Sequence, residues 1–142
     1  MKQLGVETYS FQVRSRGETD IIDITAEVQK TLSQSLLHTG IVNLFISGST
    51  AGITTIEYED GLLKDLQDAY EHLASRSGQY AHNLRWGDGN GYAHVRASLT
   101  GQDITVPFVD RRLALGTWQQ IILIDFDNRP RTREVKLTVI GE

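Results

Sequence analysis

Two stretches of alternating apolar and polar side chains constrain this chain most, because each needs a sheet partner and a core on one side. One lies between Leu4 and Val13, and the other lies between Glu134 and Val139. Such alternation is typical of a β-strand that buries one face and exposes the other. The side chains expected to face inward are Tyr9, Phe11, Val13, Val135, Leu137 and Val139. Half-buried strands at both ends favour a mainly antiparallel sheet system.

The segments between these ends predict further strands and three helices. A nearly continuous apolar run over residues 41–46 predicts a strand covered on both faces, and shorter strands are expected over 21–22, 53–58, 104–108 and 113–126. Helices are predicted over residues 25–38, 61–74 and 91–100. The first two carry inward stripes formed by Ile24, Val28, Leu32, Leu36, Leu62, Leu66, Tyr70 and Leu73. The expected fold is α+β, with about seven strands, two longer helices and one short helix in a single domain over residues 1–142.

Composition excludes several classes of function. A net charge of −4 argues against binding nucleic acid, which needs a basic surface. The chain has no cysteine, so neither disulfide bonds nor thiolate chemistry is expected. No window approaches the ~20 apolar residues of a membrane helix, and the N-terminus lacks the apolar run of a signal peptide. A cytoplasmic protein with no membrane partner is therefore expected.

The stretch from His82 to Gly101 concentrates the side chains that could carry chemistry. Alternate glycines around Asp88 and Asn90 predict a tight loop, with His82 and Asp88 on it. Asn90 is expected to cap the helix over 91–100, so that His94 lies one turn into it. Imidazoles beside a carboxylate could bind a divalent ion or a phosphate, or move a proton. The alternative is an ordinary turn with solvated histidines.

Other polar groups admit both a functional and a structural interpretation. His38 is expected to cap the end of the first helix, and His72 is expected to be solvated. Residues 47–52, Ser-Gly-Ser-Thr-Ala-Gly, follow a strand and form either an anion-binding loop or a plain polar turn. Arg129, Arg131 and Arg133 could form a basic ridge that clamps a phosphate, or merely a solvated hairpin.

Three motifs together resemble those of a known family. They are Ser-Gly-Ser-Thr-Ala-Gly-Ile-Thr-Thr at 47–55, the stretch at 82–101, and Gly-Thr-Trp-Gln-Gln-Ile at 116–121 followed by the C-terminal Val-Ile-Gly-Glu. The chain resembles the YjbQ-like family, also called the secondary thiamine-phosphate synthase family, nearly from end to end. The resemblance implies an α+β homotrimer with polar residues at the subunit boundaries. Some members have weak thiamine-phosphate synthase activity.

The resemblance also implies a set of site residues. His82, Asp88 and His94 are expected to be catalytic, and they could alternatively hold a divalent ion such as Mg or Zn. For the substrate, a phosphorylated small molecule, the resemblance implies contacts with Thr50, Asn90, Ser98, Thr117, Trp118 and Gln119. Residue type and position add Ser49, Arg85 and Arg96 to this set. Trp86 or Trp118 could provide the wall for a pyrimidine ring.

Two departures from the family pattern bear on turnover. Many members have His-Thr-Thr-Ala where this chain has Ser49-Thr50-Ala51, and Arg111 stands where a glycine is usual. If the missing histidine takes part in the chemistry, binding can survive without catalysis. The alternatives to an enzyme are therefore a trimeric protein that binds a metal or an anion without turnover, and an assembly whose polar loops only mediate subunit contact.

Overall fold

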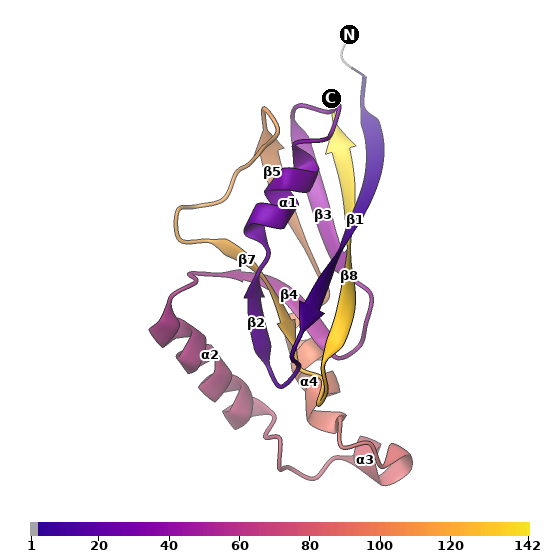
Figure 1. Cartoon of the computed structure of the whole chain (residues 1–142), viewed down its shortest axis with the longest axis vertical. Coiled ribbons are helices and arrows are strands. Elements are labelled where there is room, and N and C mark those ends of the chain that lie inside the picture. The colour runs from indigo at the N-terminus through magenta and orange to yellow at the C-terminus, as the bar shows by residue number, and fades with distance from the viewer. Residues whose placement is uncertain (1–2) are drawn as a thin grey trace.

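The computed structural model describes residues 3–142 as two antiparallel sheets with helices beside them (Figure 1). One sheet has the strand order β1-β8-β3-β5-β6 and the other has the order β2-β7-β4. In chain order the elements are β1 (Gly5–Ser15), β2 (Asp20–Asp23), α1 (Thr25–Leu32), β3 (Gly40–Ile46), β4 (Ala51–Ile56), α2 (Asp60–Leu73), α3 (Ala81–Trp86), α4 (Gly91–Thr100), β5 (Asp103–Val109), β6 (Arg112–Leu113), β7 (Gln120–Asp125) and β8 (Arg131–Gly141). The α+β class and the mainly antiparallel pairing are confirmed.

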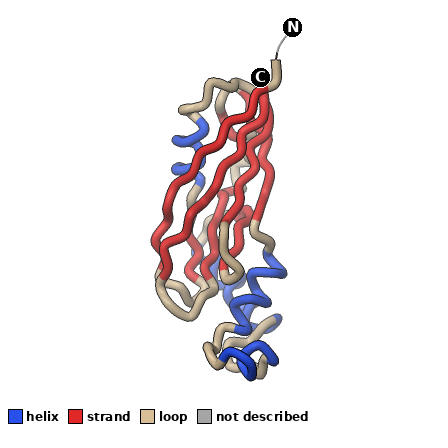
Figure 2. Tube along the Cα trace, turned by 90° about the vertical axis from the view of Figure 1, so that its right-hand side faces the viewer, coloured by secondary structure: helices blue, strands red, loops and turns tan. Residues whose placement is uncertain are grey.

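The two alternating stretches pair with each other in the larger sheet. β1 and β8 run antiparallel over their whole length, with Tyr9 opposite Leu137 and Phe11 opposite Val135 (Figure 2). The odd-numbered side chains of both strands face the core, because pairing in this register puts them on the same side of the sheet. β8 also pairs with β3, so it lies inside the sheet and β1 forms an edge.

The strand that is covered on both faces is β7, and the prediction for residues 41–46 is wrong. Ile41 and Phe45 are 43% and 42% exposed, so β3 buries only one face. In β7, alternate side chains enter two separate cores: Ile121 and Leu123 join the one beneath the larger sheet. Their neighbours Ile122 and Ile124 pack with residues of α2 and α4. The strand expected over 113–126 is accordingly split into β6 and β7 by a turn.

The helices differ from prediction where local hydrogen bonds or exposure interrupt the apolar stripe. α1 ends at Leu32 rather than near residue 38, because serines after it bond to nearby backbone groups, as Ser33 Oγ does to the Gln29 carbonyl. The expected inward residues Leu36 and Leu73 are 81% and 70% exposed. His38 therefore caps no helix; its Nε2 lies 3.1 Å from Arg111 Nη2. Within residues 3–142, no helix has the length and apolar character needed to span a membrane.

A buried polar network closes the end of β7. Asp125 and Asp127 are fully buried, and Arg133 pairs with Asp125 through Nε at 2.7 Å and Nη2 at 2.9 Å. The Thr50 hydroxyl accepts from Arg133 Nη2 at 2.7 Å and donates to Asp127 at 2.9 Å, while Arg131 lies 3.1 Å from the same carboxylate. Burial alone would raise the pKa of Asp127, but hydrogen bonds led by that from Thr50 lower it below its usual value.

This network overturns both interpretations of the arginines in the β7–β8 connection. Arg133 is buried against Asp125 and Arg131 faces Asp127, so their charges are neutralised within the chain. A ridge of three free cations does not form, and the hairpin is not merely solvated either. The spacing of two residues indicates a shared side of the strand, but it carries no information on what lies opposite.

Replacing Thr50 with valine should destabilise the protein markedly. Valine keeps the shape but removes the hydroxyl that links Arg133 to Asp127, so both buried groups lose a partner. We expect the free energy of unfolding in urea at neutral pH to fall by about 1–3 kcal/mol. The matched control is Ser49→Ala at the exposed neighbouring position, expected to change stability by less than ~0.5 kcal/mol. Coincident unfolding curves for Thr50→Val and the wild type would contradict the network.

Candidate functional site

The structure brings His82, Asp88 and His94 together at the end of the molecule formed by α3 and α4. The two imidazole rings are in contact, with their centroids 4.5 Å apart and their planes tilted by 45°. The Asp88 Oδ1 atom lies 3.5 Å from His82 Nδ1. The side chains of His82 and Asp88 are 32% and 44% exposed, so a ligand in solvent can reach them. The expectation that these three groups lie side by side is confirmed, although His82 belongs to a short helix that the sequence did not predict.

Glycines make the reversal between α3 and α4 possible. Gly87 ends α3 with φ of 64° and Gly89 has φ of 68°, and both values fall in the left-handed region that other residues avoid. The chain thereby turns back within four residues, and His94 in α4 comes to face His82 in α3. The glycine-based prediction of a tight reversal is confirmed at these two positions.

The capping role predicted for the Asn90 side chain is wrong. The N-terminus of α4 is instead capped by Asn83, whose Oδ1 accepts a hydrogen bond from the Gly91 amide at 2.9 Å. Asn90 is buried, and its Oδ1 accepts from the Asn128 amide at 3.0 Å. The Asn90 side chain also hydrogen-bonds Asp127. Asn90 therefore ties the loop to the buried network at the end of β7.

The chemistry of the histidine pair suits proton exchange and the binding of anions. An imidazole nitrogen can donate or accept a hydrogen bond and can carry a proton. His82 Nδ1 is buried and has no hydrogen-bond partner, because 3.5 Å from Asp88 is long for a strong bond. Within residues 3–142, no three histidine, cysteine or acidic side chains converge as metal ligands do. The expected divalent ion stays a prediction.

Some of the other expected site residues lie on the same two helices. Arg85 and Trp86 follow His82 in α3, with the Arg85 guanidinium 5.7 Å from the centre of the Trp86 ring. Trp86 is 67% exposed, as an aromatic wall for a ligand would need to be. Ser98 lies one turn after His94 in α4 and is also exposed, so the two share a helix face.

Arg96 is not brought to the histidines. It is 4% exposed, and its guanidinium donates to the carbonyl of Ala74, to Thr19 and to Glu71, at 3.0, 2.8 and 2.7 Å. It also stacks on Tyr92, 4.9 Å from the ring centre. Arg96 thus holds α4 to α2 and to the β1–β2 turn, and its charge is neutralised inside the chain.

The other residues expected to contact the substrate come from two separate segments, around residue 50 and at residues 117–119. Thr117, Trp118 and Gln119 precede β7, whereas the pair lies beyond its other end, roughly 20 Å away for a strand of this length. Trp118 is 70% exposed there. Thr50 is buried in the Asp127 network, and only Ser49 and its neighbours in the 47–52 loop are open to solvent.

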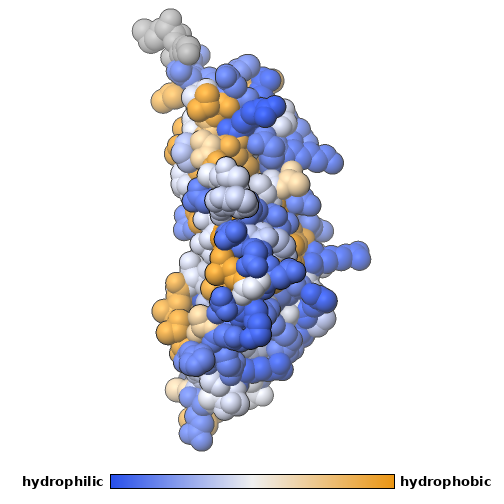
Figure 3. Space-filling view, turned by 90° about the vertical axis from the view of Figure 1, so that its left-hand side faces the viewer, coloured by the Kyte–Doolittle hydropathy of each residue, from blue (hydrophilic) through white to orange (hydrophobic). Residues whose placement is uncertain are grey.

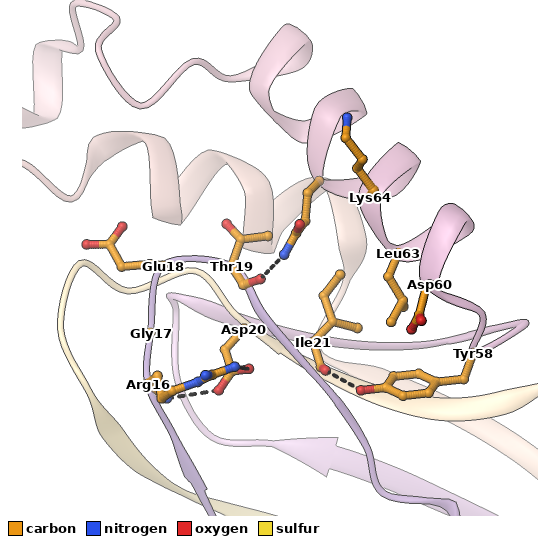
Figure 4. A pocket seen from close by; sticks show the side chains of 11 residues that line it. Arg16, Gly17, Glu18, Thr19, Asp20, Ile21, Tyr58, Asp60, Leu63 and Lys64 are labelled. Atoms are coloured by element: carbon orange, nitrogen blue, oxygen red, sulfur yellow. Dashed lines mark hydrogen bonds and ion pairs between the residues drawn. The ribbon is translucent and has the colours of Figure 1, made fainter.

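A separate groove of about 520 Å³ lies between β2 and α2, but its chemistry is mixed (Figure 4). Arg16 faces Asp20, and Lys64 is paired with Asp68, so the groove offers no surplus positive charge. Tyr58 and Gln67 donate to carbonyls of Ile21 and Thr19 along the free edge of β2. The surface over α2 is largely hydrophilic (Figure 3). These contacts protect a strand edge, and we take the histidine pair as the candidate site.

Comparison with known proteins places the chain among relatives of undefined activity. Residues 9–142 match the family described as UPF0047 protein YjbQ-like. A UPF0047 protein of Methanothermobacter thermautotrophicus is 35% identical, over 96% of this chain and 94% of its own. The UPF0047 protein YugU of Bacillus subtilis is 32% identical, over 93% of this chain and 98% of its own.

Solved structures that are similar to this chain come from the same kind of protein as its sequence relatives. A YbjQ-like protein of unknown function from Sulfolobus solfataricus superposes with a TM-score of 0.87 at 28% identity, covering 97% of this chain and all of its own. A hypothetical protein from Aeropyrum pernix superposes with a TM-score of 0.87 at 32% identity, covering 96% of this chain and 99% of its own. The match over nearly the whole chain shows that this protein belongs to the YjbQ-like UPF0047 family.

Proposed function

We propose that the site of His82, Asp88 and His94 binds a phosphorylated small molecule and exchanges a proton with it. The observation that carries this proposal is the pair of imidazole rings whose centres lie 4.5 Å apart, beside one carboxylate. An imidazole can either donate or accept a proton, so one ring can act as an acid while the other acts as a base.

An unpaired cation at the site supports a phosphate as the ligand. Within residues 3–142, Arg85 in α3 is exposed, and its guanidinium group has no carboxylate partner. It follows His82 by three residues on the same short helix. A guanidinium group binds phosphate oxygens through paired hydrogen bonds, so Arg85 suits a phosphorylated substrate.

The reaction that we propose is of the thiamine-phosphate synthase type. It joins a pyrimidine bearing a pyrophosphate to a thiazole phosphate and releases pyrophosphate. The imidazoles and Arg85 would stabilise the charge on the leaving pyrophosphate, aided by a divalent ion such as Mg or Zn if one binds, and Trp86 would stack on the pyrimidine. Release of pyrophosphate from these two substrates by the purified protein would distinguish this reaction from binding alone.

Binding without turnover is the second candidate function. It is favoured by the 47–52 loop, where serines and glycines stand in place of the histidine that many members of the family carry near Ser49. Serine is not a proton carrier at neutral pH, so one acid or base of the family site is missing. The proposal for the histidine pair as a phosphate-binding site holds for either function.

Replacing His94 with alanine should weaken the binding of pyrophosphate while the fold persists. The His94 side chain is half-buried and contacts the His82 ring, so its loss removes a polar ring of the site but little core packing. Titration calorimetry with pyrophosphate should show an affinity at least about tenfold weaker, the loss of one charge-assisted contact. The control His72→Ala removes an exposed histidine of α2 and should bind like the wild type. Equal affinity for His94→Ala and the wild type would remove the proposed site, as would loss of the fold.

We further propose a homotrimer with the site at the subunit boundary. The outer face of the larger sheet has no helix over it in Figure 2. Two rows of outward-facing side chains that cross β1, β8, β3 and β5 contain no charged residue. They are formed by Val6, Ile140, Ile41 and Pro107, and by Thr8, Thr138, Asn43 and Thr105. A second, different unpaired surface is α3, which has no buried residue and exposes Leu84 at 91%. Two unlike surfaces that no other element covers suit a closed ring, in which each subunit offers one surface to each neighbour.

Light scattering on the eluting protein should report three times the chain mass of 15.9 kDa. Ile41→Lys places a charge on the neutral sheet face and should release monomers, because a buried unpaired charge opposes association. Leu73→Lys is the matched control: Leu73 is 70% exposed on α2, outside that face, and this variant should remain trimeric. A monomeric wild type at micromolar concentration, or a trimer of unchanged stability with Ile41→Lys, would contradict the assembly.

A further inference from the structure

Asn128 makes two hydrogen bonds to the loop of the candidate site. Its Nδ2 donates to the Asp88 carbonyl at 2.8 Å, and its backbone amide donates to Asn90 Oδ1 at 3.0 Å. Asn128 lies between β7 and β8, almost forty residues further along the chain. A single residue therefore holds both ends of the Asp88–Asn90 segment.

The backbone on both sides of Asn128 is held in place by hydrogen bonds to the buried polar network. Asp127 is fully buried, and its Oδ1 accepts from the Arg129 amide at 3.2 Å. The Asp127 carbonyl accepts from the Glu18 amide at 2.7 Å. The residues on both sides of Asn128 are thus tied to the interior, so Asn128 acts as a rigid contact for the loop.

The loop itself has little else to hold it. Residues 84–89 are all exposed, α3 buries no side chain, and a side chain at Gly87 would meet nothing within 4 Å. Besides the Asn128 bonds, the Asp88 Oδ1 accepts from the Asn90 amide at 3.1 Å, and Asn83 accepts from the Gly87 and Gly91 amides at the two ends of the loop. An exposed loop with few contacts samples many conformations unless specific bonds restrain it.

We infer that Asn128 is a positioning residue, which holds the Asp88–Asn90 segment between α3 and α4 and thereby keeps Asp88 beside His82 and the two imidazole rings 4.5 Å apart. The inference concerns the same site as the proposed function and deepens it. It names a residue that the sequence motifs omit and that touches neither imidazole. Its role depends on the side-chain amide as donor, because the Asp88 carbonyl can only accept.

Two variants separate the side-chain bond from the backbone bond. Asn128→Ala removes the donor to Asp88 and keeps the amide that donates to Asn90. Asn128→Asp keeps the size but replaces the donor with a carboxylate, which repels the Asp88 carbonyl. The control is Arg129→Ala in the same turn, because the Arg129 side chain is exposed and makes no contact with the loop.

The readout is the position of the imidazole ring signals in NMR spectra recorded near pH 8, where ordinary imidazoles are neutral. In both Asn128 variants we expect the signals of His82 and His94 to move and their mutual ring contacts to weaken. The signals of His38 and His72 should stay in place, with Tm close to that of the wild type and Arg129→Ala unchanged throughout. A purely structural role would instead lower Tm and leave the His82 and His94 signals of the folded protein unmoved, which would overturn the inference.

Binding of pyrophosphate by the same proteins separates this inference from the proposed function. If the wild type binds, Asn128→Asp should bind at least about tenfold more weakly and Arg129→Ala less than threefold more weakly. If the wild type does not bind, the proposed ligand fails, but shifted His82 and His94 signals in the Asn128 variants would still support the positioning role. Wild-type ring signals in both Asn128 variants would refute it in either case.

Discussion

Burial of the Asp127 carboxylate is the interaction on which the candidate site depends. A charged group removed from water is costly unless hydrogen bonds and opposite charges compensate it. Here Thr50 comes from the start of β4, Asn90 from the loop before α4, and Arg131 from β8. Since each partner belongs to a different segment, satisfying one carboxylate fixes three parts of the chain relative to one another. The histidine pair is attached to this junction.

The sheet could be predicted from the sequence because apolar and polar residues alternate along strands that bury only one face. The alternation in β1 and β8, the short β2 and the bounds of α4 at Gly91–Thr100 agree with expectation. The clustering of His82 with Asp88 and His94 was also predictable, because glycines at 87 and 89 allow only a tight return. These features are local, so the residues themselves specify them.

Features that depend on distant partners could not be predicted. Arg133 and Arg96 look like free cations in the sequence, yet both are buried: Arg133 bonds Asp125 and Thr50, 8 and 83 residues away, and Arg96 bonds Glu71, 25 residues away. Asn90 occupies the N-cap position of α4 as expected, but the capping hydrogen bond is made by the side chain of Asn83, eight residues before the amide it accepts from. Asn128 has no motif around it at all. Which of several suitable partners a polar group chooses is decided by tertiary packing, which single-sequence patterns do not contain.

The most direct test of this account is a double-mutant cycle between Thr50→Val and Asn90→Ala, read as free energies of unfolding in urea. Both side chains bond Asp127, so removing one should change what the other contributes. The account predicts a coupling free energy of about 1 kcal/mol or more between the two positions. Effects that add to within ~0.3 kcal/mol would show that the β4 start and the site loop are independent, and would contradict the account.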